Sequence, residues 1–167
     1  KINMNTKFNL KHKPVEIITG LGSRNKLKEK IESDKYFILS SKRGKEVIKR
    51  DRILNKIIKS NKIISCINNY PDIELIEDIF NQIKDERVDF IIGFGGGSVL
   101  DATKILSYCL SFRENKIPVR ELLMSNLNLE NKNPIKTICI PTTFGTGSEV
   151  TPFSTYWDFT NKKKYSL

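Results

Sequence analysis

The sequence predicts an α/β domain built on a parallel sheet with helices on both faces. Short apolar runs, rich in β-branched and aromatic residues, alternate along the chain with longer segments whose apolar residues recur at helical spacing. Two of these runs lead directly into glycine-rich turns. Successive parallel strands need a crossover connection, usually a helix, so this alternation is typical of a parallel sheet.

The first half of the chain is predicted to contain three strands and two helices. VEIIT (residues 15–19), YFILS (residues 36–40) and IISCI (residues 63–67) are short and apolar, so each is assigned as a strand. A short helix is predicted at residues 25–31. One longer helix is predicted at residues 45–59, where basic residues lie opposite an apolar face formed by Val47, Ile48, Leu54, Ile57 and Ile58.

The second half continues the alternation. A helix is predicted at residues 73–84, with acidic residues at its start and an apolar stripe of Ile73, Ile76, Ile79, Phe80 and Ile83. VDFII (residues 88–92) is assigned as a buried strand, and residues 98–111 are assigned as the next helix. A short helix at residues 118–124 and a strand at residues 136–140 (KTICI) follow.

The end of the chain is predicted to be a hairpin. Strands at residues 153–157 (FSTYW) and 164–167 (KYSL) flank a turn at residues 158–163 (DFTNKK). Because Leu167 stands within the second strand, we expect a fragment boundary there. Residues 1–167 are therefore expected to form one α/β domain of a longer protein.

The composition is that of a soluble globular protein. Of the 167 residues, 38% are hydrophobic and 29% are charged. No apolar run approaches the ~18 residues of a membrane span, and the start of the chain lacks the apolar core of a signal peptide. Cys66, Cys109 and Cys139 are widely spaced, so they are interpreted as small core residues in a reducing compartment. We expect a cytoplasmic protein with no membrane partner.

The net charge of +10 is a property of the first third of the chain. Residues 1–62 contain 18 Lys or Arg against 6 Asp or Glu, whereas the remainder contains 11 against 13. Much of the excess lies on the predicted helix at residues 45–59, and it is interpreted as a solvated helix face. Nucleic-acid binding would normally add a recognisable motif or interleaved aromatic residues, and neither is present. We therefore expect no nucleic-acid partner.

Four glycines fall within five residues in IIGFGGGSVLDATK, residues 91–104. A strand, a glycine turn and a helix start form an anion cradle, because free N–H groups point outward and no side chain blocks the backbone. We interpret the turn as a pyrophosphate site; the alternative is a merely tight turn. No GK[ST] follows, so it is not a P-loop, and Ser98 replaces the third glycine of the common dinucleotide fingerprint. Ser98 suits a helix N-cap, Asp101 suits the helix dipole, and Lys104 could pair with Asp101.

A second glycine cluster, IPTTFGTGSEVT at residues 140–151, also follows an apolar strand. It carries four hydroxyl side chains, those of Thr142, Thr143, Thr146 and Ser148. A plain loop could contain these residues. However, the carboxyl ends of parallel strands face one crevice, where ligands bind, so both clusters are predicted to face one nucleotide.

The two clusters resemble the paired signatures of the iron-containing (group III) alcohol dehydrogenases. GGGSVLDATK and IPTTFGTGSEVT stand in the family's order and spacing. PVEIITGLGSRNKL resembles the family's N-terminal strand and turn, and YPDIELIEDIF resembles the segment before the helix that leads to the glycine strand. The resemblance covers most of the chain. It implies a Rossmann-like nucleotide-binding domain, followed in members by an all-helical C-terminal domain that is missing from this chain.

The resemblance also implies which residues hold the cofactor. The pyrophosphate would lie on Gly95, Gly96, Gly97 and Ser98. The cofactor cleft would be lined by Asp101, Thr142, Thr143, Thr146 and Ser148. Thr155 and Lys164 match later cofactor-contacting positions. The family's metal, Fe²⁺ or sometimes Zn²⁺, is bound by one Asp and three His that would follow Leu167. His12, the only histidine, is not expected to be a ligand, so this chain should supply no metal ligand and no catalytic residue.

Two departures from the family pattern concern the adenosine half of the cofactor. Where members often have an Asp that holds the ribose of NAD, ILSSKRG places Ser41, followed by Lys42 and Arg43. A carboxylate would repel a 2′-phosphate, whereas a serine and two cations could bind it, so NADP is slightly favoured over NAD. The alternative is that both cations point to solvent. Tyr70, next to Asn69, replaces the asparagine of the family's NPT, which leaves that adenine contact open.

The predicted function is that of an NAD(P)-dependent, metal-dependent alcohol dehydrogenase or aldehyde reductase. This chain would be its cofactor-binding part and inactive alone. TPFSTYWD and KKKYSL resemble the phosphonoacetaldehyde- and hydroxybutyrate-type reductase branches, which favours an acidic aldehyde as the small-molecule substrate, and a homodimer is one expected assembly. The alternatives are a polyol dehydrogenase or dehydroquinate-synthase-like relative, and a nucleotide-binding module without catalysis.

Overall fold

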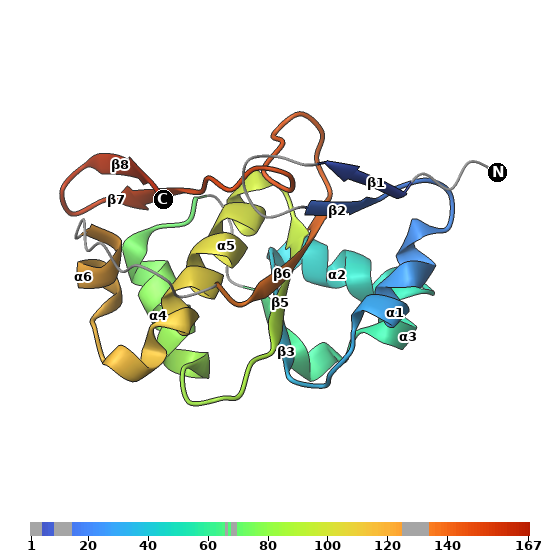
Figure 1. Cartoon of the computed structure of the whole chain (residues 1–167), viewed down its shortest axis with the longest axis horizontal. Coiled ribbons are helices and arrows are strands. Elements are labelled where there is room, and N and C mark those ends of the chain that lie inside the picture. Colours follow the sequence, from blue (N-terminus) through green and yellow to red (C-terminus); the bar gives the residue numbers. More distant parts are fainter. Residues whose placement is uncertain (1–4, 9–14, 66, 68–69, 125–133) are drawn as a thin grey trace.

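A four-stranded sheet forms the centre of the computed structural model, which describes residues 5–8, 15–65, 67, 70–124 and 134–167 (Figure 1). Its strands are β3 (Tyr36–Ser40), β4 (Ile63–Ser65), β5 (Phe90–Gly95) and β6 (Lys136–Pro141). They lie in the order β4-β3-β5-β6, and each neighbouring pair is parallel. The predicted parallel sheet is confirmed.

Helices cover both faces of this sheet, as predicted (Figure 1). α2 (Lys42–Arg50) and α3 (Leu54–Ile57) pack on one face. α4 (Ile73–Ile83), α5 (Gly97–Ser111) and α6 (Val119–Met124) pack on the other. No helix in the described part of the chain is long and apolar enough to cross a membrane.

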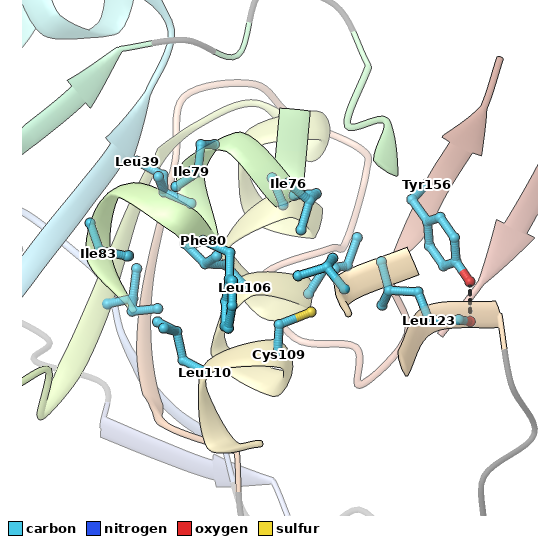
Figure 2. Close-up of a cluster of buried hydrophobic side chains, with 14 of the residues drawn as sticks. Leu39, Ile76, Ile79, Phe80, Ile83, Leu106, Cys109, Leu110, Leu123 and Tyr156 are labelled. Atoms are coloured by element: carbon cyan, nitrogen blue, oxygen red, sulfur yellow. Dashed lines mark hydrogen bonds between the residues drawn. The ribbon is translucent and has the colours of Figure 1, made fainter. Parts of the chain in front are cut away.

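Each face of the sheet has its own hydrophobic core, because successive strand residues point to opposite faces. On β3, Tyr36 and Ile38 contribute to the core beneath α2 and α3, whereas Leu39 contributes to the core beneath α4 and α5. Figure 2 shows this second core, where Leu106 and Cys109 of α5 pack near side chains of α4. The whole stripe predicted for the α4 segment is buried there: Ile73, Ile76, Ile79, Phe80 and Ile83.

The predicted helix at residues 45–59 is wrong as one element, because the structure has α2 and α3 with a break between them. Oδ1 of Asp51 accepts the backbone N–H groups of Ile53 and Leu54, both at 2.9 Å. These bonds, the one from Leu54 foremost, lower the pKa of the Asp51 carboxyl group. An aspartate that bonds the amides two and three residues ahead offers the backbone a turn in place of a continued helix.

The first predicted strand is not part of the parallel sheet. β2 (Val15–Ile18) pairs antiparallel with β1 (Asn5–Phe8) in a separate two-stranded sheet. A 3₁₀ turn, η1 (Ser23–Lys26), and one turn of helix, α1 (Leu27–Lys30), follow β2. Two further 3₁₀ turns are η2 (Ser60–Lys62) and η3 (Arg113–Asn115).

The predicted terminal hairpin is present as β7 (Thr155–Asp158) and β8 (Lys163–Ser166). Asp158 is fully buried and holds the turn. Its carboxylate accepts the backbone and side-chain N–H groups of Asn161, at 3.1 and 2.7 Å, and a guanidinium N–H of Arg120 at 2.9 Å. These bonds, the one from the Asn161 side chain foremost, lower the pKa of Asp158.

Candidate functional site

The site lies where β3 and β5 end side by side. β3 leads into α2 on one face of the sheet, while β5 leads into α5 on the other face. The two connections therefore diverge and leave a crevice between the starts of the two helices. In open parallel sheets such a switch point, at the carboxyl edge, is where ligands bind.

A cavity of about 600 Å³ occupies this crevice. Six residues predicted to bind the cofactor line it: Ser41, Gly96, Gly97, Ser98, Thr142 and Thr143. Of the described residues, Arg43, Gly44, Val47, Ile67, Phe94 and Val99 also line it. Six other predicted residues do not line it, namely Gly95, Asp101, Thr146, Ser148, Thr155 and Lys164. Contact between these six and a cofactor stays a prediction.

The glycine turn leaves the N-terminus of α5 open toward the cavity. Gly96 is the N-cap of this 15-residue helix, and no side chain caps it. Ser98 lies within the first helical turn, so its predicted role as the N-cap is wrong: the helix begins at Gly97. The first N–H groups of a helix lack partners within the helix and carry a partial positive charge. The start of α5 therefore provides hydrogen-bond donors and a field that suit an anion.

Close packing explains part of the glycine content. A Cβ on Gly95 would lie 2.6 Å from Cγ2 of Val99, closer than real Cβ contacts allow. The alternative of a tight structural turn therefore accounts for Gly95. A Cβ on Gly96 would lie 3.1 Å from Oγ1 of Thr143, and Gly96 also lines the cavity. The absence of a side chain at Gly96 thus leaves room for Thr143 of the neighbouring loop and keeps the backbone accessible from the cavity.

The second glycine loop lies against the first, at the same edge of the sheet, and the prediction that both face one nucleotide stays open. The N–H of Thr142 donates to the carbonyl oxygen of Gly95 at 2.9 Å. Cγ2 of Thr146 lies 3.1 Å from the position that a Cβ on Gly97 would take. Thr142 and Thr143 line the cavity beside the start of α5, where a threonine hydroxyl can donate to an anion.

The start of α2 forms the opposite wall. Ser41 is its N-cap, and Oγ of Ser41 accepts the N–H of Gly44 at 3.0 Å. Lys42 and Arg43 are exposed, and Arg43 lines the cavity. The first turn of α2 has no acidic residue, and no carboxylate in the described part of the chain pairs with Lys42 or Arg43. Cations near a helix N-terminus interact unfavourably with the helix dipole. Lys42 and Arg43 therefore do not stabilise α2 through their charge.

The contact that joins the two walls was missed by sequence reasoning. Oγ of the buried Ser40 donates to the carbonyl oxygen of Phe94 at 2.8 Å. A Cβ on Gly44 would lie 2.1 Å from that Oγ, so glycine lets α2 start close to the strand ends. The close start of α2 could have been predicted from the sequence SKRG directly after a strand, because it places a capping serine three residues before a glycine. Val47 and Ile67 give the cavity apolar wall, and only their hydrophobicity could have indicated it.

Asp101 and Lys104 hold the segment that follows the second glycine loop. Oδ1 of Asp101 accepts the hydroxyl of Ser148 at 2.6 Å, and Oδ2 accepts the N–H of Thr155 at 3.2 Å. Nζ of Lys104 lies 3.3 Å from Oδ1 of Asp101, so the predicted alternative of an ion pair between them is confirmed. Nζ also donates to the carbonyl oxygen of Ser148 at 2.9 Å and to two further carbonyls of the segment. These side chains anchor the loop in the structure.

Lys164 and Tyr70 lie in an aromatic cluster of the hairpin. Nζ of Lys164 is 5.6 Å from the ring centre of Trp157, and the ring centres of Trp157 and Tyr70 are 5.7 Å apart. Tyr70 is exposed and does not line the cavity. Asn69 lies outside the described residues. A cofactor contact of Lys164 stays a prediction, and the adenine contact at position 70 stays open.

The described residues offer no metal site. They contain no group of three or more His, Cys, Asp or Glu side chains that could hold a metal ion, and His12 and Cys66 lie outside them. Burial raises the pKa of Cys109 to about 12 and that of Cys139 to about 11, so both thiols are protonated at neutral pH. This donor set does not fit iron or zinc, which would need ligands from outside the described part of the chain.

Several relatives of the chain are named as dehydrogenases or reductases. The aldehyde-alcohol dehydrogenase of Streptococcus pneumoniae (serotype 4) is 32% identical over 130 residues, which are 70% of this chain and 14% of that protein. The NADPH-dependent aldehyde reductase YqhD of Escherichia coli (strain K12) is 29% identical over 147 residues, 85% of this chain and 37% of that protein. The sulfoacetaldehyde reductase of Bilophila wadsworthia is 40% identical over 94 residues, 56% of this chain and 23% of that protein. The chain spans well under half the length of each.

Solved structures share the fold. The NADH-dependent butanol dehydrogenase A of Thermotoga maritima superposes with a TM-score of 0.76 at 19% identity, covering 98% of this chain and 42% of that one. The sulfoacetaldehyde reductase of Bifidobacterium kashiwanohense, in complex with NAD⁺, superposes with a TM-score of 0.74 at 20% identity, covering 89% of this chain and 39% of that one. At these identities the likeness concerns the fold.

The family is settled by a match over nearly the whole chain. A sequence model of the iron-containing alcohol dehydrogenases matches residues 14–167. This range includes both glycine loops and every residue that lines the cavity. The resemblance carried by GGGSVLDATK and IPTTFGTGSEVT is confirmed: the chain belongs to the iron-containing alcohol dehydrogenase family.

Proposed function

We propose that the chain binds an NAD(P) dinucleotide and is the cofactor-binding part of a metal-dependent alcohol dehydrogenase or aldehyde reductase. The observation that carries the proposal is the cavity between the N-termini of α2 and α5, at the switch point of the sheet. A dinucleotide needs an anion site between two nucleoside sites, and the open start of α5 provides the anion site. Relatives of the family are more than twice as long as the chain, so reduction itself is proposed for a protein that includes more than these residues.

The start of α5 would hold the pyrophosphate. Gly96, Gly97 and Ser98 line the cavity and belong to the uncapped helix start, so their N–H groups can donate to phosphate oxygens. Thr142 and Thr143 can add hydroxyl donors from the neighbouring loop. When bound, the nicotinamide of NAD(P) accepts or donates the hydride. The residues of this chain bind the dinucleotide and orient it.

The start of α2 would hold the 2′-phosphate of NADP. Ser41 caps the helix through its oxygen, which leaves its hydroxyl hydrogen available to a phosphate. Arg43 lines the cavity, and Lys42 is its neighbour in a turn without acidic residues. The E. coli relative is described as NADPH-dependent and the T. maritima relative as NADH-dependent, so residues such as these would decide the choice.

The remaining predicted cofactor residues lie at the end of β5, around the second loop, on α5 and on the hairpin. They are Gly95, Asp101, Thr146, Ser148, Thr155 and Lys164. Gly95 belongs to the proposed pyrophosphate site, and the other five are proposed to line or contact the cofactor cleft. Asp101 and Ser148 would act by fixing the loop, since they bond to each other.

The wider assignment follows the family. Fe²⁺ or Zn²⁺ would be bound by residues outside the described part of the chain. Relatives named sulfoacetaldehyde reductase and phosphonoacetaldehyde reductase favour a small acidic aldehyde as substrate. We also propose a cytoplasmic location and a homodimer.

Calorimetric titration of the purified full-length protein with NADPH, NADH and ADP tests the proposal. We expect saturable binding of NADPH that ADP displaces, because ADP carries the adenosine and both phosphates. A folded protein that binds none of these nucleotides at millimolar concentration would refute the assignment. Metal analysis of the isolated 167-residue chain should find no stoichiometric iron or zinc, and one tightly bound equivalent would contradict the proposed location of the metal.

A further inference from the structure

Phe144 is a fully exposed phenylalanine in the second glycine loop, although aromatic side chains gain much from burial. It lies between Thr143, which lines the cavity, and Gly145, which has a φ of +92°. Within the described part of the chain, a Cβ on Gly145 or on Gly147 would meet no atom within 4 Å. The loop therefore stands clear of the other described residues where it carries this ring.

Both ends of the loop are anchored beside the start of α5. At one end, the N–H of Thr142 donates to the carbonyl oxygen of Gly95 at 2.9 Å. At the other end, the hydroxyl of Ser148 donates to Asp101 at 2.6 Å, and Lys104 donates to the carbonyl oxygen of Ser148 at 2.9 Å. Residues 142–148, here called the arch, thus hold Phe144 close to the glycine turn without packing it.

The sheet order puts the arch and α2 on opposite sides of the glycine turn. β6 pairs with β5 on the side away from β3, so the loop after β6 and the helix after β3 flank the start of α5 from two sides. Figure 1 shows the loop after β6, in orange, standing out beyond the ends of the strands. If its adenosine lies against α2 and its pyrophosphate on Gly96 and Gly97, as proposed above, a dinucleotide would extend its second nucleoside toward the arch.

We propose that Phe144 packs against the nicotinamide nucleoside of the bound dinucleotide. The inference rests on the proposed function and adds a contact to the half of the cofactor that exchanges the hydride. Nicotinamide is planar and its ribose has an apolar face, and an aromatic ring packs well on either. The contact buries the exposed ring and holds the second nucleoside beside the anchored loop.

Calorimetric titration of the full-length protein and of Phe144→Ala with NADPH and with ADP tests this contact. ADP carries the adenosine and both phosphates but lacks the nicotinamide nucleoside. We expect Phe144→Ala to weaken NADPH binding about tenfold and to leave ADP binding unchanged. Phe144→Tyr keeps the ring and should retain the affinity for NADPH. Leu21→Ala removes another fully exposed apolar side chain, between β2 and η1, and should change neither affinity.

The outcomes separate the inference from the proposal beneath it. Unchanged NADPH affinity in Phe144→Ala, with a wild type that binds NADPH, overturns the inference and leaves the proposed function standing. Equal loss of NADPH and ADP binding also overturns it, because the substitution has then disturbed the glycine turn. A wild type that binds neither nucleotide refutes the proposed function and this inference together.

Discussion

The two helix starts that border the cavity differ in almost every respect. α5 begins with Gly96 and Gly97, has no side-chain cap and carries no charge in its first residues. α2 begins with the capping residue Ser41, followed at once by Lys42 and Arg43. The first arrangement offers backbone N–H groups and open space, whereas the second offers side chains of positive charge.

This difference suggests a division of roles within one site. Backbone donors at a helix start bind a pyrophosphate. Since NAD and NADP both carry one, these donors do not discriminate between them. Side-chain cations discriminate, because only NADP carries a 2′-phosphate for them to bind. Changes at the start of α5 should therefore affect all nucleotides alike, and changes at the start of α2 should affect the choice among them.

The largest effect is expected from Gly96→Val, which blocks the backbone approach at α5. Binding of NADPH, NADH and ADP should each fall by more than about a hundredfold, since two or more charge-assisted hydrogen bonds are lost. Calorimetry measures the affinities, and denaturant unfolding checks that the domain remains folded. Gly96→Ala is the graded control, because its Cβ would lie 3.1 Å from Thr143 and needs only a small shift. Wild-type affinity in Gly96→Val would exclude the turn as the pyrophosphate site.

Ser41→Asp should have the next largest effect, confined to cofactor choice. The new carboxylate would repel the 2′-phosphate and hydrogen-bond the ribose of NAD, while still capping α2. We expect the ratio of the NADPH and NADH dissociation constants to move ten- to a hundredfold toward NADH, about the free energy of one charge-assisted hydrogen bond. An unaltered ratio would separate Ser41 from the adenosine site.

Gly44→Ala should reduce stability by roughly 1–3 kcal/mol, because overpacking a closed contact strains the fold. Its Cβ would lie 2.1 Å from Oγ of Ser40, whose hydrogen bond to Phe94 would have to break. Urea unfolding measures the loss. The double variant Ser40→Ala, Gly44→Ala removes the closest contact and leaves the Cβ 3.3 Å from the carbonyl oxygen of Phe94. It should therefore be less destabilised than the sum of the two single variants. Strict additivity would show that the two residues do not act through this contact.

A smaller effect is expected on the pH dependence of the free energy of unfolding. Hydrogen bonds lower the pKa of Asp51 and Asp158 in the folded state. A depressed carboxyl pKa contributes stability that is fully present above the unfolded value and is lost as the pH falls through the folded value. The free energy of unfolding should therefore decline below about pH 4. Asp158→Asn should make that decline shallower, and an identical pH profile in the variant would contradict the assignment.

Local patterns predicted the layers of the fold but not where elements break or pair. The buried stripe of α4 was predictable, because its apolar residues recur at one helical spacing. A strand at residues 88–92 was predictable from a short apolar run, but β5 spans Phe90–Gly95 and so includes two of the glycines assigned to the turn. The break at Asp51 was not, since apolar residues continue on both sides of it and the turn depends on which amides its carboxylate accepts. The pairing of β2 with β1 depends on a partner strand, which the sequence of one strand does not identify.

The site shows the same limit. The meeting of Gly96 and Gly97 with the threonine loop was predictable, because the carboxyl ends of neighbouring parallel strands lie at one edge of the sheet. The partners of Asp101 were not, because Ser148 and Thr155 are 47 and 54 residues away in sequence and tertiary packing decides which donor reaches the carboxylate. The requirement for glycine at position 44 was missed, because it comes from the hydroxyl of Ser40, which lies beside Gly44 only in the folded structure.

The central claim, that α2 discriminates while α5 does not, is tested most directly with Arg43→Ala. The dissociation constants of NADPH, NADH and ADP should be measured for the wild type and the variant at one fixed ionic strength, because salt screens exposed charges. The account predicts a wild type that prefers NADPH, and a variant that loses about tenfold in NADPH affinity while its affinities for NADH and ADP stay unchanged. Equal affinities for NADPH and NADH in the wild type, unchanged by Arg43→Ala, would contradict it.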